Sequence, residues 1–215
     1  MKAVPGGTFL HILKLALVNS VGFFLLGYAY MVGLVDVVLE ADKTNLSILI
    51  AGVFGVGVLA SFVTSWRIYR DMPWASYVDD DLYWNWRPDS EVDRYMEAID
   101  GHGALSRHIL IQDMKMRFVQ KTSFLRYLAG FLVILGLIGT VVGFVIALSA
   151  VEPSKVSDVT KIGPMISTLI SGMSTALYTT LLGAVFNIWI TINAATLSSA
   201  LVNLASSIVQ LGEDA

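Results

Sequence analysis

The chain contains four long apolar segments that are separated by polar stretches. They cover residues 9–39, 46–66, 128–150 and 165–197. The first contains His11, Lys14 and Asp36, whereas the other three contain no Asp, Glu, Lys, Arg or His. A helix needs about 20 apolar residues to cross the hydrocarbon core of a bilayer, and each segment meets that length. We therefore predict an all-α membrane protein with four transmembrane helices.

The polar stretches divide the chain into parts. Residues 1–66 hold transmembrane helices 1 and 2, residues 67–126 form a cytoplasmic loop and helical region, residues 127–199 hold transmembrane helices 3 and 4, and residues 200–215 form a cytoplasmic C-terminal tail. The acidic and aromatic segment 78–93 is typical of a surface turn region. Apolar residues recur at helical spacing in 104–127, so helix 3 begins before the membrane. We expect helices 3 and 4 to extend toward the cytoplasm.

Composition and charge support this picture. Hydrophobic residues make up 55% of the chain and charged residues 14%, whereas a soluble domain has about 25% charged residues. Lys and Arg gather near the N-terminus and in residues 67–126, while the opposite loops hold Lys43, Lys155 and Lys161. The positive-inside rule then places both termini and the long loop in the cytoplasm.

Several classes of chemistry have no support in the sequence. The chain has no cysteine, which excludes disulfides. Its net charge of −3 does not indicate binding to nucleic acid. The three histidines lack the spacing of metal ligands, and no nucleophile–base pair or phosphate-binding loop is visible. We therefore predict no catalytic residues, no metal site and no bound cofactor.

Small residues mark one face of the third span. Gly136, Thr140 and Gly143 are three or four positions apart and share a face of a helix, and Gly139 and Gly143 form a GxxxG pair. Small residues at this spacing allow helices in lipid to approach closely. The glycines therefore indicate helix packing. A threonine such as Thr140 can also satisfy its hydroxyl on its own helix backbone.

Hydroxyl groups mark the fourth span, which we expect to begin after Gly163–Pro164. One face carries Thr168, Ser171, Gly172, Thr175, Thr179 and Gly183. Such a face requires protein or water beside it, so it indicates either interhelical hydrogen bonds or the lining of an ion path. Because a proton relay usually needs an ionisable group at depth, the chain either moves no protons or receives the proton carrier from a partner.

Two blocks of these spans resemble the MotA/TolQ/ExbB proton-channel family. They are LGLIGTVVGFVIALS (135–149) and ISGMSTALYTTLLGAVFN (170–187), with a short loop between them. The matching positions are Gly136, Leu137, Ile138, Gly139, Thr140 and Val141 in the first block, and Gly172, Ala176, Leu177, Thr180 and Gly183 in the second.

The resemblance implies a membrane subunit of a rotary motor that is driven by an ion gradient. Five copies would surround a dimer of a single-span partner resembling MotB, TolR or ExbD, and the partner would supply a membrane aspartate. The ion path would follow Thr140 and Thr180, and the hydroxyl face of the fourth span adds Thr179 and Thr175 as candidates. Gly136, Gly139, Gly143, Gly172 and Gly183 would pack the helices. The expected location is the bacterial inner (cytoplasmic) membrane.

Two questions stay open at this level. The transported ion is H⁺ or Na⁺, and the hydroxyl of Thr179 beside Thr180 would suit sodium. The alternative function is a non-conducting membrane scaffold or assembly factor that packs through small-residue helix faces.

Overall fold

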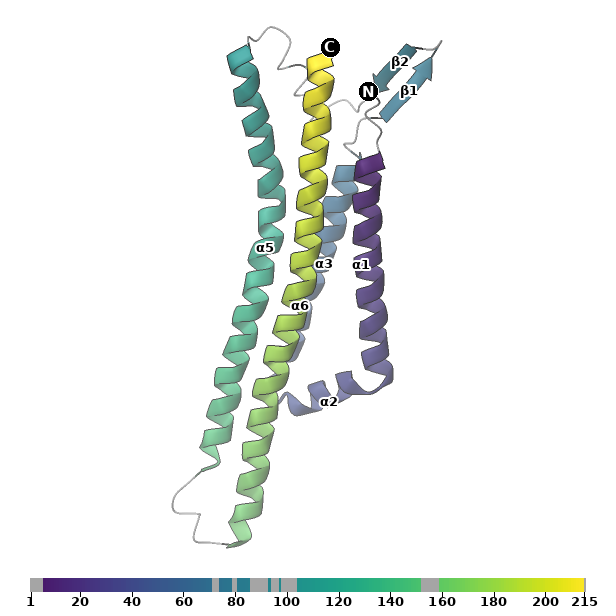
Figure 1. Ribbon diagram of the computed structural model, residues 1–215. Coiled ribbons are helices and arrows are strands. Elements are labelled where there is room, and N and C mark those ends of the chain that lie inside the picture. Colours follow the sequence, from purple (N-terminus) through teal and green to yellow (C-terminus); the bar gives the residue numbers. More distant parts are fainter. Residues whose placement is uncertain are drawn as a thin grey trace. The chain divides into compact units, whose positions relative to one another are not determined.

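The computed structural model describes residues 6–70, 74–78, 81–85, 93, 97, 104–151 and 159–214. Its helices are α1 (Gly6–Met31), α2 (Leu34–Ala41), α3 (Leu46–Arg70), α5 (Ala104–Ser149) and α6 (Val159–Asp214), and its strands are β1 (Trp74–Val78) and β2 (Asp81–Asn85) (Figure 1). In this described part, four segments are long and apolar enough to cross a membrane: Leu13–Met31, Leu46–Ile68, Thr122–Ser149 and Ile162–Ser206. The prediction of an all-α membrane protein with four spanning helices is confirmed.

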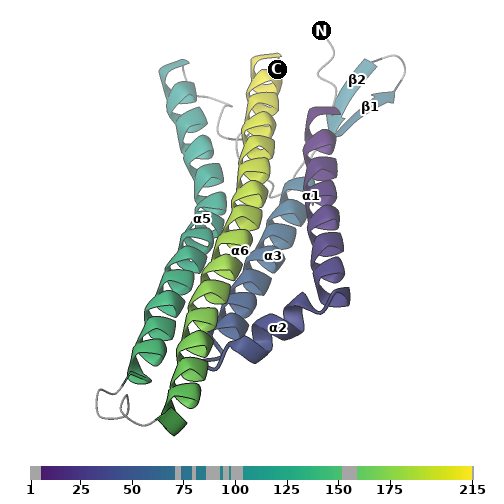
Figure 2. The ribbon, with the colours of Figure 1, turned by 60° about the horizontal axis from the view of Figure 1, so that its bottom comes forward.

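The first apolar segment was expected to form one helix over residues 9–39, and this boundary is wrong. Helix α1 ends at Met31, and α2 begins at Leu34 after a turn through Val32 and Gly33. Gly33 has φ 81°, a left-handed conformation that glycine adopts at little cost. Both Figure 1 and Figure 2 show α2 running crosswise from the end of α1 toward the start of α3.

Two other boundaries differ from the sequence-based expectation. Helix α6 begins at Val159 and continues through Pro164, rather than starting after it. Pro164 is the sixth residue of α6, so its missing N–H removes the backbone hydrogen bond to the residue four positions earlier, and the helix continues through it. In the region expected to be a surface turn, β2 pairs with β1 in an antiparallel hairpin, from Trp74 opposite Asn85 to Val78 opposite Asp81. Residues 86–92 of that region lie outside the described residues.

Two helices continue well beyond their apolar spans. Helix α5 begins at Ala104 and runs unbroken to Ser149, which confirms the prediction that the third helix starts before the membrane. Helix α6 runs to Asp214, so the segment expected as a C-terminal tail from residue 200 is helical over its described residues.

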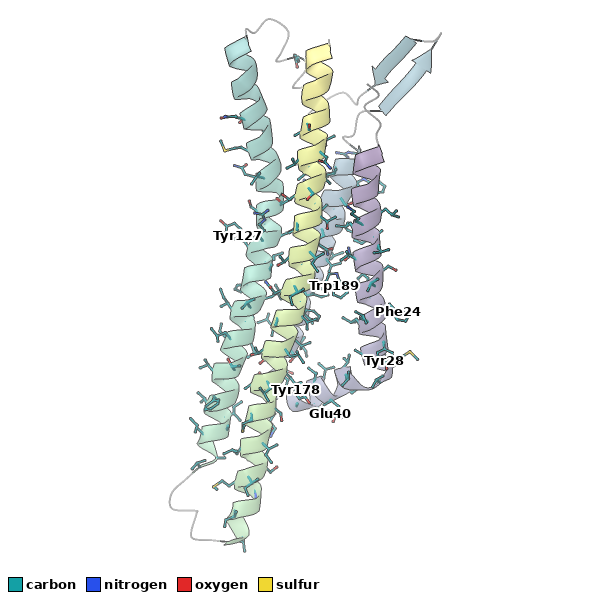
Figure 3. The ribbon with its side chains drawn as sticks, in the orientation of Figure 1. Phe24, Tyr28, Glu40, Tyr127, Tyr178 and Trp189 are labelled. Atoms are coloured by element: carbon teal, nitrogen blue, oxygen red, sulfur yellow. The ribbon has the colours of Figure 1, made fainter. Side chains whose placement is uncertain are left out.

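The chain divides into two compact units, and one consists of Ser20–Leu59 and Arg126–Thr191. An aromatic cluster forms part of its core. The ring of Phe54 stacks on Phe186 with centroids 4.1 Å apart and lies 4.9 Å from the ring of Trp189. Trp189 also contacts Phe23 edge to face at 5.4 Å, and Figure 3 shows its position on α6. These contacts join α1, α3 and α6 by apolar burial and ring packing.

The other unit consists of Met1–Asn19, Ala60–Leu125 and Ile192–Ala215. Its buried apolar residues come from four helices: Leu15, Ile68, Leu125, Ala194, Leu197, Ala200, Leu201, Leu204 and Ala205. Among them lies a reciprocal amide pair. Asn19 donates to Asn193 at 3.2 Å, and Asn193 donates back to Asn19 at 3.1 Å. Buried amides need such partners, because an unpaired polar group in an apolar core is costly.

Candidate ion-pathway site

Glycines allow α5 and α6 to lie almost backbone against backbone in the first of these units. A methyl group added to Gly143 would lie 2.6 Å from the carbonyl oxygen of Gly172, and one added to Gly183 would lie 2.6 Å from that of Leu132. A methyl group on Gly136 would meet the backbone of Thr179 and Thr180 at 3.2 and 3.3 Å. Any larger side chain at this seam would force the two helices apart.

The close approach lets one threonine reach the backbone of the neighbouring helix. The Thr180 hydroxyl donates a hydrogen bond to the carbonyl oxygen of Gly136 at 3.0 Å. The Thr140 hydroxyl donates to the carbonyl oxygen of Leu137 on its own helix at 2.6 Å. Gly136 and Thr140 are four positions apart and share one face of α5. The structure therefore brings the hydroxyls of Thr140 and Thr180 to neighbouring turns at one side of the seam.

That side of the seam is open and otherwise apolar. Thr180 is exposed and Thr140 is half-buried. Around them, Leu137, Val141, Leu177 and Leu181 each expose 58% or more of their surface. The two hydroxyls thus lie on an apolar surface of α5 and α6 that the described residues leave uncovered. We call this the α5–α6 face.

The other two expected ion-path residues lie inside the unit. Thr175 and Thr179 are both 0% exposed. The Thr175 hydroxyl lies 2.6 Å from the carbonyl oxygen of Ala41 and 3.1 Å from that of Ser171, while the Thr179 hydroxyl donates to the carbonyl oxygen of Thr175 at 2.8 Å. Their hydroxyls are satisfied by the backbone, and the structure does not bring them to the α5–α6 face.

The adjacent hydroxyls of Thr179 and Thr180 also do not converge. Successive residues on an α-helix point about 100° apart, so neighbours in sequence do not face the same partner. Thr179 contacts Gly139 within the unit, whereas Thr180 is exposed. The two hydroxyls therefore point to different surroundings, and the choice between H⁺ and Na⁺ stays a prediction.

Four polar residues of the described helices and loops were missed at the sequence level. Asn187 donates to the carbonyl oxygen of Ala129 at 2.7 Å and thus provides a second side-chain link from α6 to α5. Asn193 pairs with Asn19, and Asp42 caps the turn before α3. The signal was present for the asparagines, because an amide within an apolar span requires a hydrogen-bonding partner.

Asp42 occupies the corner between α2 and α3. Its carboxylate accepts hydrogen bonds from the backbone N–H of Thr44 at 2.9 Å, the hydroxyl of Thr44 at 2.7 Å and the backbone N–H of Ser47 at 2.5 Å. Burial raises the pKa of this carboxyl, but the hydrogen bonds from Thr44 and Ser47 outweigh burial and lower the pKa below its ordinary value. The charged form of Asp42 thus stabilises the turn between α2 and α3.

The α5–α6 face has hydroxyls but no proton carrier. Residues 127–151 and 162–206 contain no Asp, Glu, Lys, Arg or His. A threonine hydroxyl has one proton to donate and two lone pairs that accept, but it does not ionise at neutral pH. The site can therefore bind and orient an ionisable group or an ion, but an ionisable group has to come from outside these two spans.

Residues 104–210, which include all of α5 and most of α6, match the MotA/TolQ/ExbB proton channel family. Searches of curated proteins and of solved structures give no match.

Proposed function

Because the chain belongs to the MotA/TolQ/ExbB proton channel family, we propose that it is the membrane subunit of a motor driven by an ion gradient. In this proposal five copies surround a dimer of a single-span partner that resembles MotB, TolR or ExbD. The partner supplies a membrane aspartate, and ion flow past it performs mechanical work. The subunit lies in the bacterial inner membrane with both termini in the cytoplasm, as its distribution of Lys and Arg favours.

The observation that carries this proposal is the composition of the α5–α6 face. It is an exposed apolar surface with two hydroxyls, Thr140 and Thr180, and no ionisable side chain. An apolar helix with one carboxyl group is complementary to such a surface. A charged residue at the centre of a membrane helix costs on the order of 2.5–3.5 kcal/mol on insertion scales, so the carboxyl requires polar contacts.

The hydrogen bonds of the two threonines indicate which form of the carboxyl they receive. Each hydroxyl proton is donated to a backbone carbonyl, so the lone pairs remain as acceptors. Such a site accepts a hydrogen bond from a protonated carboxyl. A deprotonated carboxylate requires at least one threonine to rotate and donate to it. Proton release and rotation of a hydroxyl are therefore coupled in this proposal.

The available energy is sufficient for mechanical work. One elementary charge that crosses a potential of 100 mV releases about 2.3 kcal/mol. The passage of a few ions thus exceeds the free energy of several hydrogen bonds of the kind that links α5 and α6, which average about 0.6 kcal/mol in membranes.

The test is to express the chain with the product of a neighbouring gene that encodes one N-terminal span with an aspartate. The complex is purified, and its mass is measured. A ratio of five to two supports the motor subunit. A homo-oligomer that does not retain the partner contradicts it and favours the alternative, a non-conducting scaffold. The glycine contacts at the α5–α6 seam would serve a scaffold equally well.

A further inference from the structure

Helix α2 is a short helix between two membrane spans, and the function proposed above does not use it. It has 8 residues, far fewer than the roughly 20 needed to cross a bilayer. It follows the span Leu13–Met31 and precedes the span Leu46–Ile68. Since it runs crosswise between these helices (Figures 1 and 2), its axis lies closer to the plane of the membrane than theirs.

The two sides of α2 differ in polarity. Leu34 and Val38 are four positions apart and share one side, whereas Asp36 and Glu40 share the opposite side. Figure 3 shows Glu40 pointing away from α1 and α3. The described residues leave about half of this apolar surface uncovered, since Leu34 is 53% exposed and the flanking Val37 and Leu39 are each 47% exposed, while Val38 is half-buried.

The C-terminal end of α2 is bonded to another helix, and its N-terminal end follows a tight turn. At its start, Gly33 turns the chain and its carbonyl oxygen accepts from the N–H of Val37 at 3.1 Å. At its end, the carbonyl oxygen of Ala41 accepts from the buried hydroxyl of Thr175 on α6, and Asp42 closes the next turn. Helix α2 therefore presents a defined side toward the spans and a defined side away from them.

We propose that α2 is an interfacial helix that binds the surface of the lipid bilayer. Its Leu34–Val38 side lies among the acyl-chain carbons next to the headgroups, and its Asp36–Glu40 side faces water. A short amphipathic helix in this position buries its apolar side between headgroups and acyl chains. In this way α2 sets the depth at which the α2–α3 corner meets the membrane.

The residues next to α2 fit this depth. Tyr28 and Tyr30 in the last turns of α1 are 61% and 65% exposed, and Figure 3 shows Tyr28 close to the corner between α1 and α2. Tyrosine is enriched at the boundary between membrane and water. Because α2 contains no Lys or Arg, its contact with lipid is apolar and does not depend on anionic headgroups.

The test measures depth with a fluorescent maleimide, and the chain suits it because it has no native cysteine. The first matched pair is Leu34→Cys and Asp36→Cys, which lie on opposite sides of α2. Val56→Cys on α3, which is 50% exposed in the middle of a span, provides the reference for the membrane interior. Each labelled chain is reconstituted into phosphatidylcholine vesicles. Quenching is then measured with iodide in water and with lipids that carry a nitroxide near the headgroup or deep in the acyl chain.

The proposal expects several-fold stronger quenching of the Leu34 probe by the shallow nitroxide lipid than by iodide, and the reverse for the Asp36 probe. The Val56 probe responds most to the deep nitroxide. Equal quenching of the Leu34 and Asp36 probes by iodide would place α2 in water and overturn the proposal. Protection of the Leu34 probe from both quenchers would also overturn it, because another protein chain would then cover that side. The pair Val38→Cys and Glu40→Cys repeats the comparison if a probe at Leu34 disturbs folding.

Discussion

The Thr180 hydroxyl crosses the seam between two helices to donate to the carbonyl oxygen of Gly136 at 3.0 Å. The contact depends on glycine at position 136, where a methyl group would lie 3.3 Å from the Cα of Thr180. The family motif in α5 thus has a direct structural role, since its first glycine admits the threonine of α6. The same arrangement leaves Thr180 at the exposed edge of the seam.

Removing either hydroxyl of the α5–α6 face is expected to abolish ion-driven activity and to leave assembly intact. Thr180→Val and Thr140→Val keep the shape of the side chain but lose the oxygen, and the interhelical hydrogen bond of Thr180 is worth only about 0.6 kcal/mol by membrane averages. Proton flux into vesicles that contain the complex with its partner measures the effect. Thr180→Ser is expected to retain flux. The control is Thr196→Val, because Thr196 also bonds its own helix, at Ile192, but lies away from the seam. Full flux in both seam variants would refute the role of these hydroxyls.

Adding a methyl group at the seam is expected to destabilise the chain. Gly172→Ala would place its methyl group 2.6 Å from the carbonyl oxygen of Gly143, and such overpacking costs about 1–3 kcal/mol. Gly130→Ala on α5 is the matched control, since a methyl group there meets nothing within 4 Å. Thermal unfolding in detergent is expected to show a lower midpoint for Gly172→Ala and an unchanged or higher midpoint for Gly130→Ala. Equal midpoints would show that the helices do not approach as described.

The buried amide pair is expected to behave as one unit. Asn193→Leu removes the amide that donates to the carbonyl oxygen of the Asn19 side chain, and a buried polar atom that loses such a hydrogen bond costs about 1–3 kcal/mol. Replacing both asparagines by leucine removes both polar groups, so the double variant is expected to lose less stability than the sum of the two single variants. A double-mutant cycle on the free energy of unfolding measures this coupling. Additive losses would contradict a direct pair.

Asp42 is expected to make the stability of the chain depend on acid pH. Its folded pKa lies below the ordinary value of 3.8, so its contribution is fully present above that value and is lost as pH falls through the folded pKa. The thermal unfolding midpoint of the parent chain is therefore expected to fall below about pH 4. In Asp42→Asn this acid-dependent loss is expected to be smaller. Asp36→Asn on exposed α2 is the control and is expected to follow the parent. Parallel pH curves for all three chains would contradict the role of the Asp42 carboxylate.

Much of the fold is visible in the sequence because a bilayer imposes length and polarity on each spanning helix. The break at Gly33 was missed because most residues after it are also apolar. An interfacial helix and a spanning helix both need apolar residues, so composition does not distinguish them. The hairpin of β1 and β2 was missed because its residues also suit an exposed turn. In both cases the local composition is compatible with two structures, and only the backbone geometry shows which of the two is formed.

The sequence by itself determined which segments span the membrane, which chemical groups they contain and which family motif they carry. It placed Thr140 and Thr180 in those spans through the family motif, and Thr175 and Thr179 through the hydroxyl face of the fourth span. The tertiary structure decided that Thr175 and Thr179 are buried while Thr140 and Thr180 lie at an open edge. The physical reason is that helical periodicity fixes which residues share a side, but the neighbouring elements decide which side they cover.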